Sequence, residues 1–255
     1  RKGGRQPLKG PDAVAYRLAI SACARTPRGE RWIDAIRLLD EMRKETGAAD
    51  VVAYTAAITG CAGAGEWIKA FQLLDLMRKE NIEPNVVTYS AVIDACATAS
   101  AMAARSRDDN NTNNNNGEEK VDNTDSHTAI QKPMKKAIQL LKALNKDQST
   151  VDPNIVTYNA AIRACAEGLD LDAAFCIMKE LQSCKGRIEP NIVTYGSLMT
   201  ACERVGNVDG ASRVFGMMRD HNEQLQNSKE EEDEKGTVTT RTMKPNEIIY
   251  GAAIS

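Results

Sequence analysis

The chain has 255 residues, 42% of them hydrophobic, 27% charged and 4% aromatic, and its formal net charge at pH 7 is −2. This apolar content excludes a wholly disordered chain, and no run reaches the roughly 18–20 consecutive apolar residues of a membrane helix. We therefore expect no membrane partner, and a charge so close to zero does not by itself indicate a nucleic-acid partner. The seven cysteines raise the question of disulfides or zinc.

The tyrosines and most of the cysteines recur with one shared spacing. Successive tyrosines are separated by 38, 35, 69, 37 and 55 residues, and five cysteines each lie seven residues after a tyrosine: Cys23, Cys61, Cys96, Cys165 and Cys202. Two residue types with the same irregular spacing indicate an internal repeat of about 35 residues, with insertions in the longer copies. Each of these cysteines follows Ala or Gly and none forms a Cys-x-x-Cys pair, so we interpret them as buried, reduced packing residues of an intracellular protein. Cys176 and Cys184 fall outside the series and receive no role.

The copy without insertions, residues 51–85, predicts two helices joined by a glycine-rich turn. Each half has apolar residues at mixed three- and four-residue spacings: Val52, Ala56, Ile58 and Cys61, then Ile68, Phe71, Leu74 and Met77. Pro84 favours an extended entry to the next helix, and Asn85 is a good N-cap residue for it. One antiparallel pair of this size cannot bury its own apolar face, so the pairs must stack on their neighbours.

The same template divides the whole chain. It predicts the tail of a preceding repeat, five repeats and the start of a sixth: residues 1–12, then 13–50, 51–85, 86–154, 155–191 and 192–246, then 247–255. Both ends fall inside repeats and there is no initiator methionine, so we expect a piece of a longer array. The predicted fold class is an all-α solenoid of antiparallel helix pairs.

Two polar insertions account for the longer copies. One, at about residues 98–132, contains an asparagine-rich tract and is expected between the two helices of its repeat; the other, at about residues 222–243, contains the acidic run 230–234. Their composition predicts disordered loops, with other proteins as candidate partners. Without the stretches 105–132 and 222–246, each of net charge −2, the remainder carries +2, a weakly basic balance that permits a nucleic-acid partner.

The junctions between repeats resemble those of a known family. A Pro-Asn pair precedes Val-Val-Thr-Tyr or Ile-Val-Thr-Tyr at three boundaries: residues 84–89, 153–158 and 190–195. With the 35-residue period and the Ala- and Cys-containing first helix, this motif resembles the pentatricopeptide repeat, in an array similar to its P-type form. The 34-residue tetratricopeptide pattern of Trp, Leu-Gly and Tyr is absent. The resemblance implies a right-handed superhelix that binds single-stranded RNA, one base per repeat, as a monomer without cofactors. It also implies a mitochondrial or chloroplast protein that acts in RNA processing, stability or translation.

The resemblance also assigns residues to RNA. The position after each tyrosine varies and is polar wherever it is not glycine, so we expect it to face a groove: Arg17, Thr55, Ser90, Asn159, Gly196 and Gly251. In the family this residue pairs with the residue that closes the repeat to read a base: Asp50, Asn85, Asn154, Asn191 and Asn246. An aliphatic residue three positions before it packs against the base: Val14, Val52, Val87, Val156, Val193 and Ile248.

The pairs imply a short base preference. Thr55 with Asn85, and Ser90 with Asn154, resemble adenine readers, and Asn159 with Asn191 resembles a pyrimidine reader, for cytosine more than uracil. Arg17 with Asp50 departs from the common pairs and has an internal salt bridge as its alternative, while Gly196 with Asn246 lacks one reading side chain. A closing Asn or Asp also has N-capping as an ordinary structural role, and both roles can coexist.

Nothing in the sequence indicates catalysis or a metal site. The only histidines are His127, in the polar insertion, and His221, near a helix end, and no deaminase signature of His-x-Glu with Cys-x-x-Cys is present. We therefore expect a non-enzymatic chain, although a catalytic domain outside it stays open. The alternative function is a helical scaffold for protein–protein interaction.

Overall fold

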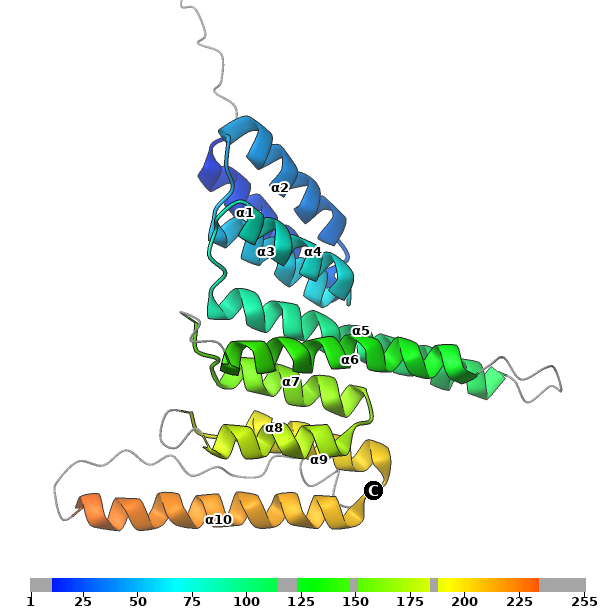
Figure 1. Ribbon diagram of the computed structural model, residues 1–255, viewed down its shortest axis with the longest axis vertical. Helices are drawn as coiled ribbons and strands as arrows, with labels where there is room; N and C mark the ends of the chain where they lie inside the picture. The colour runs from blue at the N-terminus through cyan, green and yellow to red at the C-terminus, as the bar shows by residue number, and fades with distance from the viewer. Residues whose placement is uncertain (1–10, 114–122, 147–150, 184–187, 234–255) are drawn as a thin grey trace, which may run out of the picture. The chain divides into compact units, whose positions relative to one another are not determined.

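A computed structural model describes residues 11–113, 123–146, 151–183 and 188–233. Within these ranges the chain is all-α, with ten α-helices, one 3₁₀ turn and no strand (Figure 1). The chain divides into two compact units, residues 1–99 and residues 100–255. The boundary falls inside α5 (Val86–Asn113), and each unit is described by itself.

Unit 1 is built from α1 (Ala13–Ala24), α2 (Trp32–Thr46), α3 (Val51–Gly63), α4 (Trp67–Lys79) and the first part of α5. The 3₁₀ turn Pro27–Gly29 connects α1 to α2. Helix α1 packs against α2 and α3, and α3 also packs against α4, so first helices contact both their own partner and the next first helix.

Unit 2 contains the rest of α5 and α6 (Asn123–Lys146), α7 (Ile155–Glu167), α8 (Leu171–Ser183), α9 (Ile192–Val205) and α10 (Val208–Asp233). Helix α7 packs against α6, α8 and α9, and α9 packs against α8 and α10. The stacking rule of unit 1 therefore recurs.

Helices α1, α3, α5, α7 and α9 begin in the same way. The residue before each helix accepts a backbone N–H of its first turn through a side-chain oxygen, at 2.8–3.1 Å: Asp12, Asp50, Asn85, Asn154 and Asn191. An N-cap of this kind stabilises a helix by about 0.5–2 kcal/mol. The closing residues thus have a structural role that does not depend on any ligand.

The repeated cysteines are packing residues, as the sequence predicts. All five are buried: Cys23, Cys61, Cys96, Cys165 and Cys202. Burial raises the pKa of Cys61, Cys96 and Cys165 to about 12, so their thiols stay protonated at neutral pH. Cys176 is exposed, and Cys184 lies outside the described residues.

The insertions are more helical than the loops expected from their composition. Helix α5 runs to Asn113, α6 starts at Asn123, and α10 continues to Asp233. Ala101 and Ala104 are buried, and the Ser100 hydroxyl donates to the Ile130 carbonyl at 2.9 Å. Alanine is the best helix former, and this buried pairing lets α5 and α6 extend together. Residues 114–122 and 234–243, the remainder of the two insertions, lie outside the described residues.

One described helical stretch, Val86–Ser106 in α5, is long and apolar enough to cross a membrane by length and composition alone. However, 56% of that stretch is buried inside the protein, as in the core helix of a folded domain. A count of uninterrupted apolar runs does not detect this stretch, because polar residues interrupt it.

Candidate nucleic-acid interface

Five valines on the first turns of the first helices are exposed to solvent. Each is the second residue after the N-cap, and between 50% and 57% of each remains accessible: Val14, Val52, Val87, Val156 and Val193. Single exposed apolar residues are ordinary, but the same residue type exposed at the same position of five helices is not explained by chance. These valines offer apolar contact to a flat ligand beside each helix start.

In unit 1 a polar network at the starts of α3 and α5 joins Thr55 to Asn85. Their side chains meet through Thr88, whose oxygen lies 2.7 Å from Thr55 Oγ1 and 3.0 Å from Asn85 Oδ1. Thr88 is fully buried, whereas Thr55 is partly accessible and Asn85 is exposed. Two residues that are 30 positions apart in the chain therefore present their polar groups side by side.

Unit 2 has the same arrangement around Asn159 and Asn191. The Asn159 amide nitrogen donates to Asn191 Oδ1 at 3.2 Å, and the hydroxyl of buried Thr194 donates to Asn159 Oδ1 at 2.7 Å. Thr194 Oγ1 also lies 3.1 Å from Asn191 Oδ1. Both asparagines are partly accessible. The residues assigned to one pair by the sequence are therefore in direct contact.

Arg17 and Asp50 form the internal salt bridge that the sequence offered as their alternative. Arg17 Nη1 lies 3.3 Å from Asp50 Oδ2, and Arg17 Nε also donates to the Ala13 carbonyl at 3.3 Å. The pair is about one-third exposed, so it contributes little stability. The salt bridge does occupy the Arg17 guanidinium and the Asp50 carboxylate, which would otherwise be available to a ligand.

The remaining pairs are only partly described. Ser90 is buried, and its hydroxyl donates to the Val86 carbonyl at 2.8 Å, so it is the least accessible post-tyrosine residue among those described. Its partner Asn154 belongs to unit 2, where it caps α7. Gly196 has open space around its Cα, and Asn246 lies outside the described residues.

Two family models match the sequence. The model of the PPR repeat family matches residues 49–98, and the pentatricopeptide repeat domain model matches residues 139–202 and 177–222. These matches cover slightly more than half of the chain and include α3, the start of α5, and α7 to α9. The chain belongs to the pentatricopeptide repeat (PPR) family.

Solved PPR structures have the same fold. The PPR domain of Arabidopsis thaliana protein-only RNase P 1 (PRORP1), solved in complex with tRNA, is 13% identical, with a TM-score of 0.55 over 95% of this chain and 99% of that one. Nuclear proteinaceous RNase P 2 (PRORP2) of A. thaliana is 12% identical, with a TM-score of 0.52 over 82% of this chain and 38% of PRORP2. Maize PPR10 is 22% identical over 96% of this chain and 37% of its own, with a TM-score of 0.43. No curated protein matched the sequence. The likeness to PRORP1 and PRORP2 establishes the PPR fold of stacked helix pairs.

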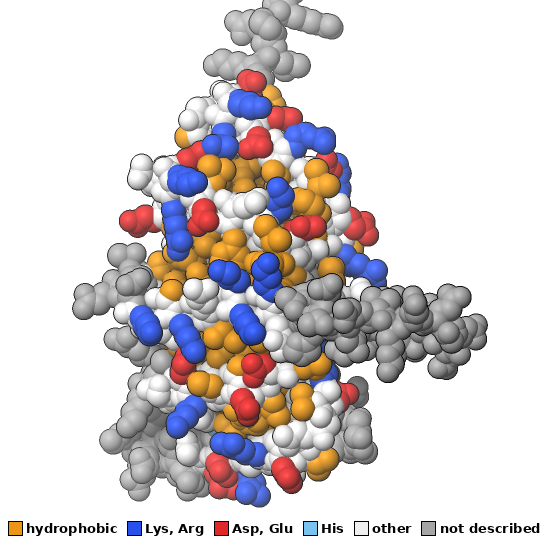
Figure 2. All heavy atoms as spheres, turned by 45° about the vertical axis from the view of Figure 1, so that its right-hand side comes forward, with side chains coloured by type: hydrophobic (Ala, Val, Ile, Leu, Met, Phe, Trp, Pro, Cys, Tyr) orange, Lys and Arg blue, Asp and Glu red, His pale blue; other side chains and the backbone are white. Residues whose placement is uncertain are grey.

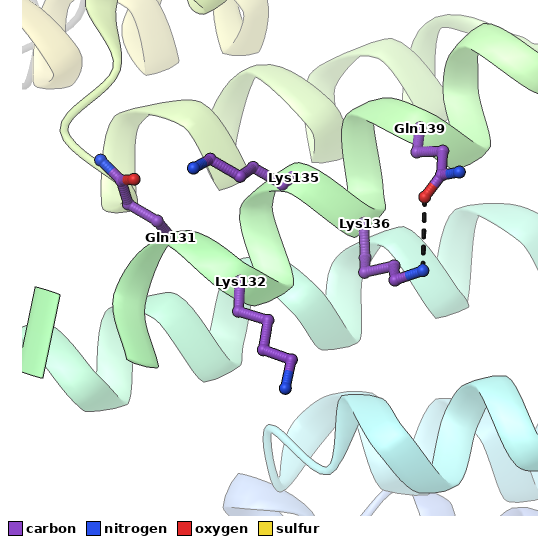
Figure 3. Close-up of a pocket in the computed structure, with 5 residues that line it drawn as sticks. All are labelled: Gln131, Lys132, Lys135, Lys136 and Gln139. Atoms are coloured by element: carbon purple, nitrogen blue, oxygen red, sulfur yellow. Dashed lines mark hydrogen bonds between the residues drawn. The ribbon is translucent and has the colours of Figure 1, made fainter. Parts of the chain in front are cut away.

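The PPR helices also carry a basic stretch that the repeat pattern alone does not reveal. Residues 130–146 of α6 contain five lysines and no acidic residue. Lys142 and Lys146 line a hollow of about 930 Å³ at the end of α6 that lies beside the start of α7. Asn154 and Tyr158 also line it, as do the acidic residues Asp152 and Glu180. Lys132, Lys135 and Lys136 lie further along the same helix, and Figure 3 shows their side chains projecting from it. Elsewhere basic and acidic side chains are interspersed on the face drawn in Figure 2.

The described part of the PPR chain has no cluster of three or more His, Cys, Asp or Glu that would hold a metal ion. His221 accepts from or donates to the Tyr195 hydroxyl through Nδ1 at 3.0 Å, and burial lowers its pKa, which Glu189 partly offsets. This contact links α9 to α10 and serves packing. The side chain of His127 lies outside the described residues.

Proposed function

We propose that this chain binds single-stranded RNA, with one base per repeat. The observation that carries the proposal is the recurrence of an exposed valine beside a polar pair at successive helix starts. The valine supplies apolar contact to the face of a base, and the pair supplies hydrogen-bonding groups for its edge. The PPR domain of PRORP1 was solved in complex with tRNA, which supports RNA as the ligand class.

The contents of the pairs favour particular bases. Thr55 with Asn85, and Ser90 with Asn154, correspond to adenine, and Asn159 with Asn191 corresponds to a pyrimidine, cytosine before uracil. The Arg17–Asp50 ion pair engages its own groups and corresponds to weak preference. The proposed target therefore contains a short adenine-adenine-pyrimidine core.

Lysines near the helix starts supply attraction for the RNA backbone. Lys142 and Lys146 share a hollow with Asn154, so phosphates of a strand read at Asn154 pass close to them. Such contacts add affinity without sequence preference.

We further propose that the protein acts in a mitochondrion or chloroplast, in RNA processing, stability or translation, without catalytic activity in this chain.

One observation favours the alternative, a scaffold for proteins. In unit 1 the second helices α2 and α4 border a mainly apolar groove of about 430 Å³, lined by residues that include Trp32, Ile33, Leu73 and Leu76. Figure 2 shows apolar side chains reaching the surface of this unit. A groove on the second helices leaves the exposed valines of the first helices unused, so it explains less of the surface than RNA does.

Selection of bound RNA from a random pool tests the proposal. We expect enrichment of single-stranded sequences that contain adenine, adenine and a pyrimidine at successive positions, one base per repeat. A matched pool selected on a variant with Val52, Val87, Val156 and Val193 all changed to Ser should lose the enrichment. Absence of any enriched RNA at low salt would favour the protein scaffold.

A further inference from the structure

We propose that Thr88 and Thr194 are positioning residues that fix which polar groups the reading pairs present to a base. Thr157 holds the same place before Tyr158, and we refer to the three as the linking threonines. The inference rests on the proposed RNA-binding function. It goes beyond the reading pairs because no linking threonine needs to touch the ligand itself.

The hydroxyl of Thr88 contacts three polar neighbours: the Asn85 backbone N–H, Asn85 Oδ1 and the Thr55 hydroxyl. The Asn85 backbone N–H donates to Thr88 Oγ1 at 3.3 Å, so the hydroxyl proton points elsewhere. Two acceptors lie within reach, Thr55 Oγ1 at 2.7 Å and Asn85 Oδ1 at 3.0 Å, and full burial of Thr88 excludes water as a substitute. We assign the proton to Asn85 Oδ1, because an amide oxygen is a stronger acceptor than a hydroxyl oxygen. Thr88 then accepts from Thr55, whose hydroxyl lies 2.7 Å away. Each hydroxyl has one proton, so the proton of Thr55 points inward and its lone pairs remain for the ligand.

The same bonds fix the direction of the Asn85 amide. Its oxygen accepts from the Thr88 hydroxyl and from the Thr88 backbone N–H at 2.9 Å. A flipped amide would place its N–H₂ donors against a donor, so Nδ2 faces outward. Thr55 and Asn85 therefore offer one acceptor and one donor. That combination satisfies the whole pairing edge of adenine, which has one amino donor and one ring acceptor.

In unit 2, Thr194 leaves a different set of hydrogen-bonding groups for the ligand. Its oxygen accepts from the Asn191 backbone N–H at 3.0 Å and its proton goes to Asn159 Oδ1 at 2.7 Å. Asn159 in turn donates to Asn191 Oδ1, which leaves amide N–H groups of both asparagines for the ligand. A donor-rich pair fits two neighbouring acceptors, which cytosine presents at N3 and O2.

The aspartate-capped helices provide an internal comparison. Where the closing residue is Asp12 or Asp50, the residue at the linking position is Ala15 or Ala53, and its backbone N–H alone meets the cap. A carboxylate has two equivalent acceptor oxygens, so no hydroxyl is needed to choose between its ends. Where the closing residue is Asn85, Asn154 or Asn191, a linking threonine is present. Asn246 is followed by Ile249 at this position and lies outside the described residues.

Ser90 shows a second direction that a hydroxyl at the post-tyrosine position can take. Its hydroxyl donates to the carbonyl of Val86, four residues earlier in the same helix. Thr55 has the same option with the Val51 carbonyl if Thr88 no longer holds its proton. In that state its lone pairs no longer have one fixed direction toward the base.

The test is Thr88→Val, which removes the hydroxyl at nearly constant volume, compared with Thr88→Ser, which keeps it. Affinities for RNAs that carry each of the four bases at this repeat should show the adenine preference reduced roughly two- to tenfold in T88V and retained in T88S. Thr59→Val, on the exposed face of α3, is the matched control. In a chain that also carries Asn85→Asp, T88V should leave the base preference unchanged. Both oxygens of a carboxylate are acceptors, so no hydroxyl is needed to fix its orientation.

A measurement without RNA separates this inference from the proposed function. Three-bond couplings about χ1 of Thr55, from NMR of the free protein, should report one rotamer in wild type and T88S and a changed or averaged one in T88V. Failure of wild type to bind RNA would remove the proposed function but leave this readout. An unchanged Thr55 rotamer, or an unchanged adenine preference in T88V, would overturn the positioning role.

Discussion

The Arg17–Asp50 and Asn159–Asn191 pairs have the same backbone setting and opposite chemistry. In both, the closing residue caps a first helix and meets the post-tyrosine residue of the preceding first helix. The first pair is an ion pair at 3.3 Å whose charges satisfy one another. The second is an amide pair that keeps N–H groups for a ligand. Under the proposed function, the same helix start can therefore hide or present groups that read a base, according to two side chains.

The comparison also separates stability from recognition. Asp and Asn are about equally good N-caps, so the closing position can change its recognition chemistry while the helix keeps its start. The linking position differs between the two settings as well, with Ala53 near the ion pair and Thr194 near the amide pair. Substitutions at these positions test the contrast, and their expected effects differ in size.

The largest effect is expected from removing the closing amide. Asn191→Ala should lower the free energy of unfolding by about 0.5–2 kcal/mol, because the helix cap is removed, and base discrimination at this repeat by about 1–3 kcal/mol. Asn191→Asp should keep the stability and change the preferred base, since acceptors replace the outward N–H donors. Denaturant unfolding and RNA titration with each base measure the two quantities. If N191D kept the wild-type base preference, the amide would not read the base.

Opening the ion pair should have the next largest effect. Arg17→Thr removes the cation and leaves Asp50 with a free oxygen, so this repeat should gain a base preference worth about 1 kcal/mol. The preferred base should have donors on its edge, as guanine does, because a carboxylate only accepts. The stability should change little because the ion pair is partly exposed. Competition between RNAs that differ only at this position checks the gain, and equal binding of all four would contradict it.

The valines should contribute affinity that does not depend on base identity. Val156→Ser should weaken binding to every RNA by about 0.5–1 kcal/mol, the value of burying the exposed half of a valine. Val208, which is 75% exposed at the start of α10, is the matched control because it lies on a second helix. V208S should bind like wild type. An effect of V156S on one base only would assign Val156 to the edge rather than the face of the base.

The starts of the first helices could be predicted from sequence because their signals are local. Pro84 followed by Asn85 predicts an N-cap without knowledge of any distant residue, and a cap is found there. The extension of α5 to Asn113 could not be predicted in this way. Its composition resembles a loop, and the contacts that favour the helix, such as Ser100 with Ile130, join residues far apart in the chain.

In the candidate site, too, some features could be predicted from sequence and others depend on packing. The Arg17–Asp50 salt bridge was an alternative open to sequence reasoning, because opposite charges at paired positions attract. The contacts of Thr88 could not be predicted, although the residue belongs to the recurring motif. Its contact with Thr55 spans 33 positions and depends on how α3 packs beside α5 within unit 1. Repetition identifies positions, but the hydrogen-bond partners come from packing.

The smallest effect is expected from the lysines of α6. For single strands, the slope of log affinity against log salt falls by about 0.7 for each phosphate that the protein no longer neutralises. Lys142→Gln with Lys146→Gln should therefore lower the slope by about 1.4 if both meet phosphates. Lys132→Gln with Lys135→Gln makes the same charge change on the same helix, roughly 15–20 Å further from the start of α7. Since charges are screened beyond about 8 Å at physiological salt, the control should leave the slope nearly unchanged. Equal slopes for the two double variants would mean that the lysines act through net charge alone, and that the backbone of the RNA does not pass the hollow beside Asn154.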